Sequence, residues 1–185
     1  SEAFNRVIGC NSVRLVLCEK PLAMRLSVAA EMIQNASDKG ISVAVNYIRR
    51  YDPGIQLLLN RTSAGEFGFP LKVTGRYSKG MFNGGSHVVD LLHAMLGDVR
   101  NVTILRCGDL LDGWDPEVDV RLEYDEGQAY LSASGKESPT DLEIKIQGNK
   151  GEVFYNNREV YCRTLAHDTK AVGPTILEEI PLAMH

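Results

Sequence analysis

Two short apolar segments, separated by a helix-like stretch, constrain the fold of this chain more than any other feature. Residues 13–18 (VRLVLC) and 41–47 (ISVAVNY) have the apolar character of strands in a parallel sheet, so we expect 13–18 to be buried on both faces. Between them, Ser27 is a candidate N-cap and Gly40 a helix terminator. The apolar stripe of this helix comprises Val28, Met32, Ile33 and Ala36. Strand, helix and strand in this order predict a right-handed βαβ unit.

The pattern after residue 50 predicts a second region of the α+β type. Asp52 is a candidate cap for a helix with Pro53 in its first turn, and Gly65 ends this helix. Residues 71–77 read as a strand, and residues 86–96 read as a helix. Five short runs predict an antiparallel sheet: 102–107, 118–124, 129–135, 142–148 and 152–157. Two segments read as loops, 137–141 and 167–174.

Composition and charge argue against several classes of protein. The 185 residues are 44% hydrophobic and 24% charged, as in ordinary globular domains, and the net charge of −4 comes with scattered basic residues. A nucleic-acid partner would need a basic patch, and a membrane span would need about 20 apolar residues, so we expect neither partner. The four cysteines lie far apart without a C-x-x-C pair, which favours a reduced, cytoplasmic protein over a disulfide or zinc framework.

Glu19, Lys20 and Pro21 follow the first predicted strand. Ligands of open α/β sheets bind outside the carboxyl ends of the strands, and Pro21 turns the chain there by fixing its φ angle. Lys20 is therefore a candidate acid–base group, and Glu19 could tune it or contact a ribose. The alternative is an ordinary Glu-Lys turn on the protein surface.

A glycine pair before the predicted helix at 86–96 marks a second candidate site. Gly84 and Gly85 allow a ligand to approach the backbone closely, and His87 lies in the first helical turn. Asp90 shares a helix face with His87 and could orient its ring. The alternative is a helix N-terminus with a polar edge.

A metal site built on this helix fails on geometry. His87 and His93 lie about 240° apart around a helix, so a single ion would not reach both side chains. We interpret His93 as a satisfied or exposed histidine, and we assign no role to His167 or His185.

Polar side chains also follow the second predicted strand, on the same rim as Lys20. These residues are Asn46, Tyr47, Arg49 and Arg50. An arginine at this rim could bind a carboxylate or phosphate, or it could pair with Glu66 or Asp52. The sequence contains no G-x-G-x-x-G, H-E-x-x-H, G-x-S-x-G or P-loop motif, so the phosphate cradle for a dinucleotide is absent from it.

Three segments in this order and spacing resemble the Gfo/Idh/MocA family of NAD(P)-dependent oxidoreductases. CEKPLA (18–23) is similar to the family's E-K-P signature after the fifth Rossmann strand, and VNYIRRYDPG (45–54) to its segment leading out of the Rossmann domain. FNGGSHVVDLLHAMLGD (82–98) is similar to its G-x-H-x-x-D helix. The resemblance implies an α/β (α+β) fold. Residues 1–50 would be a βαβ remnant of a Rossmann domain, and 51–185 a substrate and oligomerisation domain with a large, mainly antiparallel open sheet.

The resemblance also implies roles for the candidate residues. Lys20 would relay the proton of a substrate hydroxyl and contact the nicotinamide ribose, with Glu19 and Pro21 also at the cofactor. His87 would be the other acid–base group. Many members carry an aspartate where this sequence has Asn83, so Asn83 would only orient the substrate. We assign further substrate contacts to Asp90, Arg49 and Tyr47.

The expected activity is hydride transfer between NAD or NADP and a hydroxyl of a sugar, polyol or nucleotide sugar. The family's first four Rossmann strands, with the glycine fingerprint, would precede Val13. We therefore expect a chain that is truncated relative to the family and binds NAD(P) weakly or not at all. The alternative is a non-catalytic module that binds a sugar-like ligand or dimerises.

A homo-oligomer is expected through the open sheet, because an open apolar face must be covered. Candidate contact residues on one side of the strands are Val102, Ile104, Val118, Val120, Leu122, Ile144 and Ile146. The alternative is that the chain's own helices bury this side.

Overall fold

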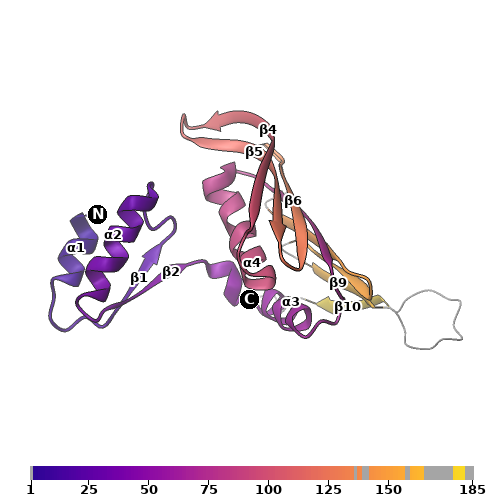
Figure 1. The fold of residues 1–185 in the computed structure, drawn as a ribbon, viewed down its shortest axis with the longest axis horizontal. Helices are drawn as coiled ribbons and strands as arrows, with labels where there is room; N and C mark the ends of the chain where they lie inside the picture. Colours follow the sequence, from indigo (N-terminus) through magenta and orange to yellow (C-terminus); the bar gives the residue numbers. More distant parts are fainter. Residues whose placement is uncertain (1, 136, 139–141, 157–158, 165–176, 182–185) are drawn as a thin grey trace, which may run out of the picture. The chain divides into compact units, whose positions relative to one another are not determined.

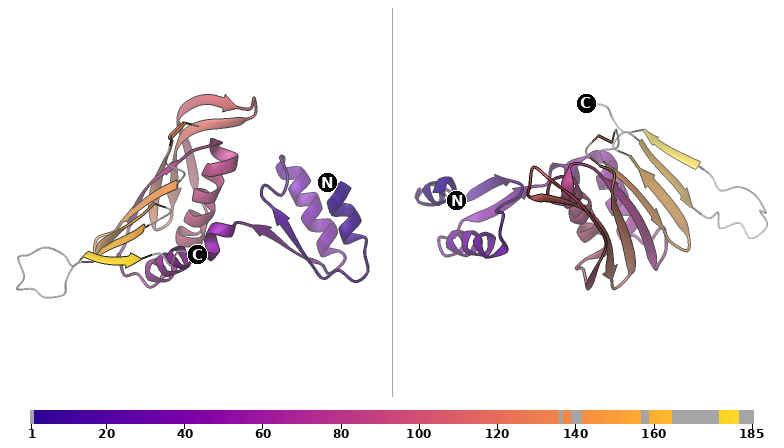
Figure 2. Two further views of the ribbon diagram at one scale, coloured as in Figure 1. Left: turned by 180° about the vertical axis from the view of Figure 1, so that it is seen from behind. Right: turned by 90° about the horizontal axis from the view of Figure 1, so that it is seen from above.

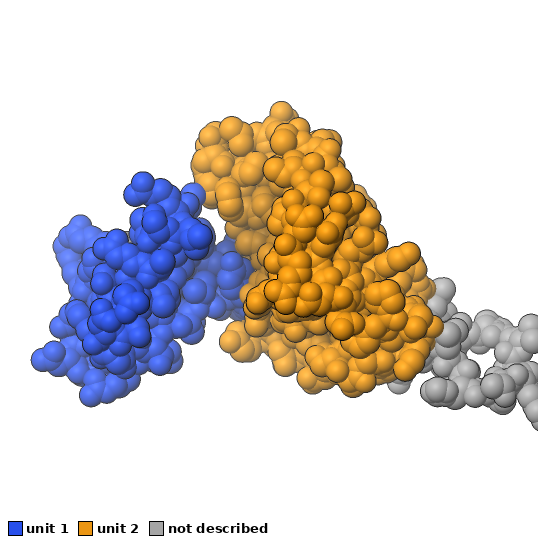
Figure 3. All heavy atoms as spheres, viewed as in Figure 1, with its two compact units in different colours: residues 1–48 blue, residues 49–185 orange. Residues whose placement is uncertain are grey.

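The chain divides into two units, residues 1–48 and residues 49–185 (Figure 3). The structure is a computed structural model that describes residues 2–135, 137–138, 142–156, 159–164 and 177–181. The predicted loop 167–174, and residues 139–141 of the other predicted loop, lie outside these ranges. Within the described ranges, no helix combines the length and the apolar character needed to cross a bilayer.

Residues 1–48 form the predicted βαβ unit, preceded by one further helix (Figure 1). The elements are α1 (Glu2–Ile8), β1 (Leu15–Glu19), α2 (Leu26–Ser37) and β2 (Ser42–Asn46). β1 and β2 pair in parallel, with Glu19 opposite Asn46 at their carboxyl ends. The buried core of this unit comprises Phe4, Ile8, Met32, Ala36 and Ile41.

The expectation that residues 13–18 are buried on both faces is wrong. Leu15 and Leu17 are 63% and 66% exposed. Successive side chains of a strand point to opposite faces, and it is the face with Val16 and Cys18 that packs against the core of this unit.

The predicted cap of α2 is also wrong. The helix begins at Leu26, because the backbone of Arg25 is extended, and Ser27 therefore already lies in the first helical turn. Of the predicted apolar stripe, Met32 and Ala36 are buried, whereas Ile33 is 44% exposed.

In the described part of residues 49–185, and in the segment leading into it, there are two α-helices and two shorter helical segments. They are η1 (Ile48–Tyr51, a 3-10 helix), α3 (Pro53–Ser63), η2 (Gly80–Gly85, a π-helix) and α4 (Ser86–Leu96). Asp52 Oδ1 accepts a hydrogen bond from Ile55 N at 3.1 Å, which confirms the predicted cap of α3. The π-helical turn η2 directly precedes α4, and the sequence pattern did not predict it.

A mixed sheet of eight described strands completes this unit, in the order β10-β9-β8-β7-β3-β6-β5-β4. The strands are β3 (Leu71–Tyr77), β4 (Asn101–Leu111), β5 (Asp115–Tyr124), β6 (Gly127–Ala133), β7 (Leu142–Gln147), β8 (Gly151–Tyr155), β9 (Glu159–Thr164) and β10 (Leu177–Pro181). Neighbouring strands are antiparallel except β3 and β6, so the mainly antiparallel open sheet is confirmed. β9 and β10 extend it beyond the predicted strands.

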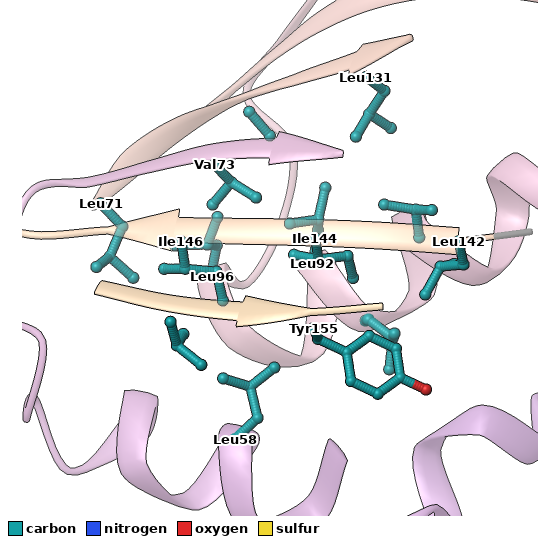
Figure 4. Packing of buried hydrophobic residues seen from close by; sticks show 14 of the residues in the cluster. Leu58, Leu71, Val73, Leu92, Leu96, Leu131, Leu142, Ile144, Ile146 and Tyr155 are labelled. Carbon is teal, nitrogen blue, oxygen red and sulfur yellow. The ribbon is translucent and has the colours of Figure 1, made fainter. Parts of the chain in front are cut away.

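One face of the sheet packs against α3 and α4, as Figures 1 and 2 show for α4. In β3, Leu71 and Val73 belong to this core (Figure 4). Tyr77 of the same strand is also buried in it, and exposed residues lie between the buried ones. The same core buries Val120, Leu122, Ile144 and Ile146. These four residues were expected to be oligomer contacts, and this expectation is wrong because the chain's own helices cover them. Val102 and Ile104 on the edge strand β4 remain 57% and 61% exposed.

The opposite face of the sheet is open and polar. It holds a shallow cavity of about 440 Å³, lined among others by Thr74, Arg76, Leu105, Arg106, Tyr130 and Lys145. Ion pairs cross this face, with Arg106 Nε 2.7 Å from Asp119 Oδ2 and Lys145 Nζ 2.9 Å from Glu152 Oε2. A partner that covers the sheet would therefore meet charges and isolated apolar side chains on this face.

Candidate active site

The carboxyl ends of β1 and β2 bring the first group of candidate residues together. Asn46 Nδ2 donates a hydrogen bond to Glu19 Oε1 at 2.8 Å, so the two strand ends are joined through their side chains. Lys20 follows directly and is half-buried, and its peptide bond to Pro21 is cis. Tyr47, also half-buried, follows Asn46. This rim is where parallel α/β sheets place their ligands.

The turn η2 holds Asn83 in the second unit. Asp115 at the start of β5 is 3% exposed, and its carboxylate accepts hydrogen bonds from Phe82 N at 2.8 Å and Asn83 N at 3.0 Å. Two backbone donors thus compensate a buried carboxylate and fix the turn to the sheet. The side chain of Asn83 remains exposed.

The glycine pair in this turn serves the chain's own packing. A Cβ atom at Gly84 would lie 1.9 Å from the carbonyl oxygen of Ser78, so no other residue fits there without a shift of the backbone. A Cβ atom at Gly80 would lie 2.2 Å from the Asp115 carboxyl group. The glycines therefore allow the close approach of η2 to the strand end and to Asp115.

His87 is the second residue of α4, and Asp90 follows one turn later. His87 is half-buried, with its Nδ1 atom shielded from solvent. The carboxylate of Asp90 faces Arg50: Arg50 Nε donates to Asp90 Oδ2 at 2.6 Å, and Arg50 Nη2 donates to the Asp90 carbonyl oxygen at 3.2 Å. Asp90 thus ties α4 to η1.

The neighbouring arginine, Arg49, contacts the sheet. It donates a hydrogen bond to the hydroxyl of Tyr155, and burial raises the pKa of that hydroxyl above its ordinary value. Figure 4 shows this tyrosine in the core cluster. The two acidic partners considered for the arginines are engaged elsewhere, because Glu66 pairs with Arg61 and Asp52 caps α3.

His93 is an exposed, satisfied histidine, as interpreted from the sequence. Its Nδ1 atom lies 3.2 Å from the Gly97 carbonyl oxygen and 3.5 Å from Asp98 Oδ1, and its side chain is 54% exposed. Among the described residues there is no group of three or more His, Cys, Asp or Glu side chains suited to a metal ion. His167 and His185 lie outside the described residues.

The candidate site residues are divided between the two units. Glu19, Lys20 and Tyr47 belong to residues 1–48, whereas Asn83 and His87 belong to residues 49–185. Sequence reasoning missed Asp115, which anchors the turn that carries Asn83. The signal for it is weak: an aspartate before a proline at the start of a strand reads as an ordinary turn residue.

The fold is shared with solved oxidoreductases. It superposes on levoglucosan dehydrogenase, solved in complex with NADH and L-sorbose, with a TM-score of 0.77 over 96% of this chain and 57% of that chain. At 16% sequence identity, this likeness establishes the fold alone. The fold is that of NAD-binding oxidoreductases of the Gfo/Idh/MocA type.

Proteins related in sequence identify particular enzymes to which this chain is similar. The inositol 2-dehydrogenase of Salmonella typhimurium (strain LT2) is 30% identical over 104 residues, which cover 50% of this chain and 31% of that protein. The scyllo-inositol 2-dehydrogenase (NAD(+)) of Bacillus subtilis (strain 168) is 26% identical over 162 residues, 75% of this chain and 47% of that protein. No model of a protein family matches. The chain is thus homologous to inositol 2-dehydrogenases over less than half of their length, which confirms the resemblance inferred from the motifs.

Proposed function

We propose that this chain supplies the substrate-side residues of an NAD(P)-dependent oxidoreductase. The reaction is hydride transfer between the nicotinamide and a hydroxyl-bearing carbon of an inositol or a related sugar, polyol or nucleotide sugar. The observation that carries this proposal is the homology to inositol 2-dehydrogenases. The clusters at the ends of β1 and β2 and at the start of α4 agree with it.

Lys20 and His87 are the proposed proton carriers. When a hydride leaves a carbinol carbon, the hydroxyl proton needs an acceptor, and amine and imidazole side chains are suited to that task. Both residues are half-buried, which allows contact with a ligand while limiting exchange with water. Asn83 has an amide that donates and accepts hydrogen bonds but takes up no proton, so its proposed role is to orient the substrate hydroxyl.

The residues at the carboxyl end of β1 are suited to bind the nicotinamide ribose of a dinucleotide. Glu19, Lys20 and Pro21 lie at the carboxyl end of a parallel strand. Asn46 Nδ2 donates to Glu19 Oε1 at 2.8 Å and so orients the carboxylate that we propose for a ribose hydroxyl. The glycine-rich cradle for the pyrophosphate does not occur in the 185 residues. When bound, the nicotinamide supplies the hydride chemistry, and these residues would hold its ribose.

Arg49, Tyr47 and Asp90 are the proposed further substrate contacts. Arg49 is half-buried, and its hydrogen bond to the Tyr155 hydroxyl holds the guanidinium group in place. The Asp90 side chain is 13% exposed, and its ion pair with Arg50 holds the carboxylate one helical turn after His87.

A second copy of the chain is the proposed partner of the open sheet face. Leu105 is 53% and Tyr130 is 39% exposed there, and the paired charges around them would fix how two copies align.

The second candidate function is a non-catalytic module that binds a sugar or dimerises. The observation that favours it is Asn83, because an asparagine stands where a carboxylic acid would take part in proton transfer.

Turnover of the natural protein that carries this sequence tests the proposal. It is assayed with NAD⁺ and NADP⁺ against inositols, sugars and nucleotide sugars, beside the variants Lys20→Ala and His87→Ala. We expect each variant to lose about 100-fold or more in kcat, as for removal of an acid–base group. His93→Ala is the matched control and should keep wild-type turnover. Wild-type turnover in both site variants would show that the assignment is wrong.

A further inference from the structure

Two exposed aromatic rings stack on each other beside Asn83. The ring centroids of Phe82 and Trp114 lie 6.0 Å apart, and the ring planes differ by 9°. Even in this stack, Phe82 is 48% and Trp114 is 45% exposed. Phenylalanine is among the residues most often buried, so two aromatic rings left half in solvent form a surface that needs an explanation.

The ring pair is held rigidly. The Asp115 carboxylate accepts hydrogen bonds from Phe82 N and Asn83 N, and we call this arrangement the Asp115 clamp. Phe82 is one of its donors, and Trp114 directly precedes Asp115. Trp114 N also donates to the Leu111 carbonyl oxygen at 3.1 Å, which closes the turn between β4 and β5. The tip of this hairpin and the turn η2 are thus joined by one ring contact and by two hydrogen bonds from backbone N–H groups to the Asp115 carboxylate.

The ring pair adjoins the candidate substrate residues of the same unit. Phe82 directly precedes Asn83 in η2, and His87 follows five residues after Phe82, in the first turn of α4. The stack therefore lies within about one turn of the residue proposed to carry the proton. π-helical turns of this kind occur frequently at functional sites.

We propose that Phe82 and Trp114 form a platform for the apolar face of a six-membered polyhydroxylated ring. This inference rests on the proposed function and names how its substrate is recognised. In a cyclitol or pyranose, hydroxyls project around the rim, whereas C–H groups cover the two faces. The faces of aromatic rings carry negative partial charge and attract such C–H groups, while the neighbouring Asn83 amide meets a rim hydroxyl.

The platform predicts discrimination between rings and open chains. An acyclic polyol such as mannitol has the same density of hydroxyls as an inositol but no rigid apolar face. It would keep the hydrogen bond to Asn83 and lose the contact with the aromatic surface. Selectivity for the ring over the open chain is therefore the property that the stack adds.

The tryptophan is itself the reporter for the test, because Trp114 is the single tryptophan of the 185 residues. The chain is titrated with myo-inositol and, separately, with mannitol, while tryptophan fluorescence is recorded. We expect a saturable change with myo-inositol and a much weaker response with mannitol. Phe82→Ala should weaken inositol binding about threefold to tenfold, the effect of one lost aromatic contact. Tyr130→Ala removes an exposed ring on the open sheet face and should leave the affinity unchanged.

Saturation-transfer NMR on myo-inositol provides a second readout that does not depend on Trp114. Binding by NMR without a fluorescence change, and with wild-type affinity in Phe82→Ala and Trp114→Ala, would overturn the platform and leave the proposed function intact. Absence of binding for every sugar and cyclitol by both methods would overturn both proposals. Circular dichroism checks that the variants fold. Light scattering in which Trp114→Ala dissociates an oligomer at unchanged inositol affinity would reassign the rings to a subunit contact.

Discussion

Arg50 and Asp90 form an ion pair that joins the segment entering the second unit to the helix carrying His87. Arg50 Nε lies 2.6 Å from Asp90 Oδ2, and the Asp90 side chain is only 13% exposed. Forty residues separate the two in the sequence. The pair therefore fixes η1 against α4 and gives the region around His87 a defined shape.

Replacing Arg50 by methionine should destabilise the protein. The substitution leaves the nearly buried Asp90 carboxylate without its charged donor, and we expect a loss of about 1–2 kcal/mol in the free energy of unfolding. Urea denaturation measures this loss. Arg100→Met is the matched control, because the pair of Arg100 with Asp125 is 60% and 65% exposed, and it should have no measurable effect. Equal losses in the two variants would contradict the proposed anchoring role.

Asp115→Ala should loosen the turn η2. The variant removes the acceptor of two backbone donors, Phe82 N and Asn83 N, and we expect about 1–3 kcal/mol of destabilisation. Hydrogen exchange should show faster exchange of these two amides in particular. Asp109→Ala, at an exposed position of the neighbouring strand β4, serves as the control. Unchanged protection of both amides in Asp115→Ala would refute the clamp.

Stability should fall at alkaline pH partly through Tyr77. Burial raises the pKa of Tyr77 to about 12, and its hydroxyl donates to the Val118 carbonyl oxygen at 2.6 Å. An unfolded tyrosine loses its proton near pH 10, so the folded state binds more protons between about pH 10 and 12. The contribution of Tyr77 to the free energy of unfolding is complete below about pH 10. It is lost as the pH rises from about 10 to 12, by about 1 kcal/mol per pH unit.

Comparison of Tyr77→Phe with the wild type isolates this effect. The variant should show a shallower decline of the free energy of unfolding above pH 10, measured by urea denaturation at several pH values. The exposed Tyr130→Phe should follow the wild-type curve. A wild-type alkaline slope in Tyr77→Phe would mean that another group is responsible.

The 185-residue chain should bind NADH weakly. The pyrophosphate of a dinucleotide is held by a glycine-rich strand–helix turn, and this sequence has no G-x-G-x-x-G. Calorimetric titration with NADH measures the affinity. A dissociation constant in the micromolar range would show that the residues at the ends of β1 and β2 suffice, and would overturn this prediction.

Leu105→Asp should disrupt self-association if a second copy covers the open sheet face. Leu105 is 53% exposed at the cavity on that face, where a subunit contact would bury an apolar side chain but would remove a carboxylate from water. Light scattering should report a lower mass for the variant than for the wild type. Leu57→Asp, on α3 beside the other face of the sheet, is the control. An unchanged mass in Leu105→Asp would remove this face as the contact.

Local sequence patterns predicted correctly those helices and strands whose structure depends on a single segment. The strand predicted at 71–77 and the helix predicted at 86–96 have those bounds in the structure, because alternation and helical periodicity are properties of a single segment. The cap at Asp52 followed from the same kind of local rule. The resemblance to the oxidoreductase family likewise used short segments, each made of consecutive residues, together with their order and spacing.

Sequence patterns did not predict burial or contacts that depend on residues far away in the chain. Leu15 and Leu17 have the composition of a buried strand, but burial depends on which elements cover them. The sequence LEEIP of β10 has no period-two alternation, and its backbone pairing with β9 places it in the sheet. The role of Asp115 depends on donors more than 30 residues away, which no local rule identifies.

The amino-acid sequence by itself determined the α/β class, the βαβ unit, the helix carrying His87 and the likeness to a family of oxidoreductases. Hydrophobic periodicity and short motifs each involve a few neighbouring residues, so they can be read from the sequence without the structure. The tertiary structure alone decided that Arg50 holds Asp90, that Asp115 holds the turn of Asn83, and that Phe82 and Trp114 stack. These contacts join distant segments, and their energies depend on burial and geometry that arise only when the sheet and its helices pack together.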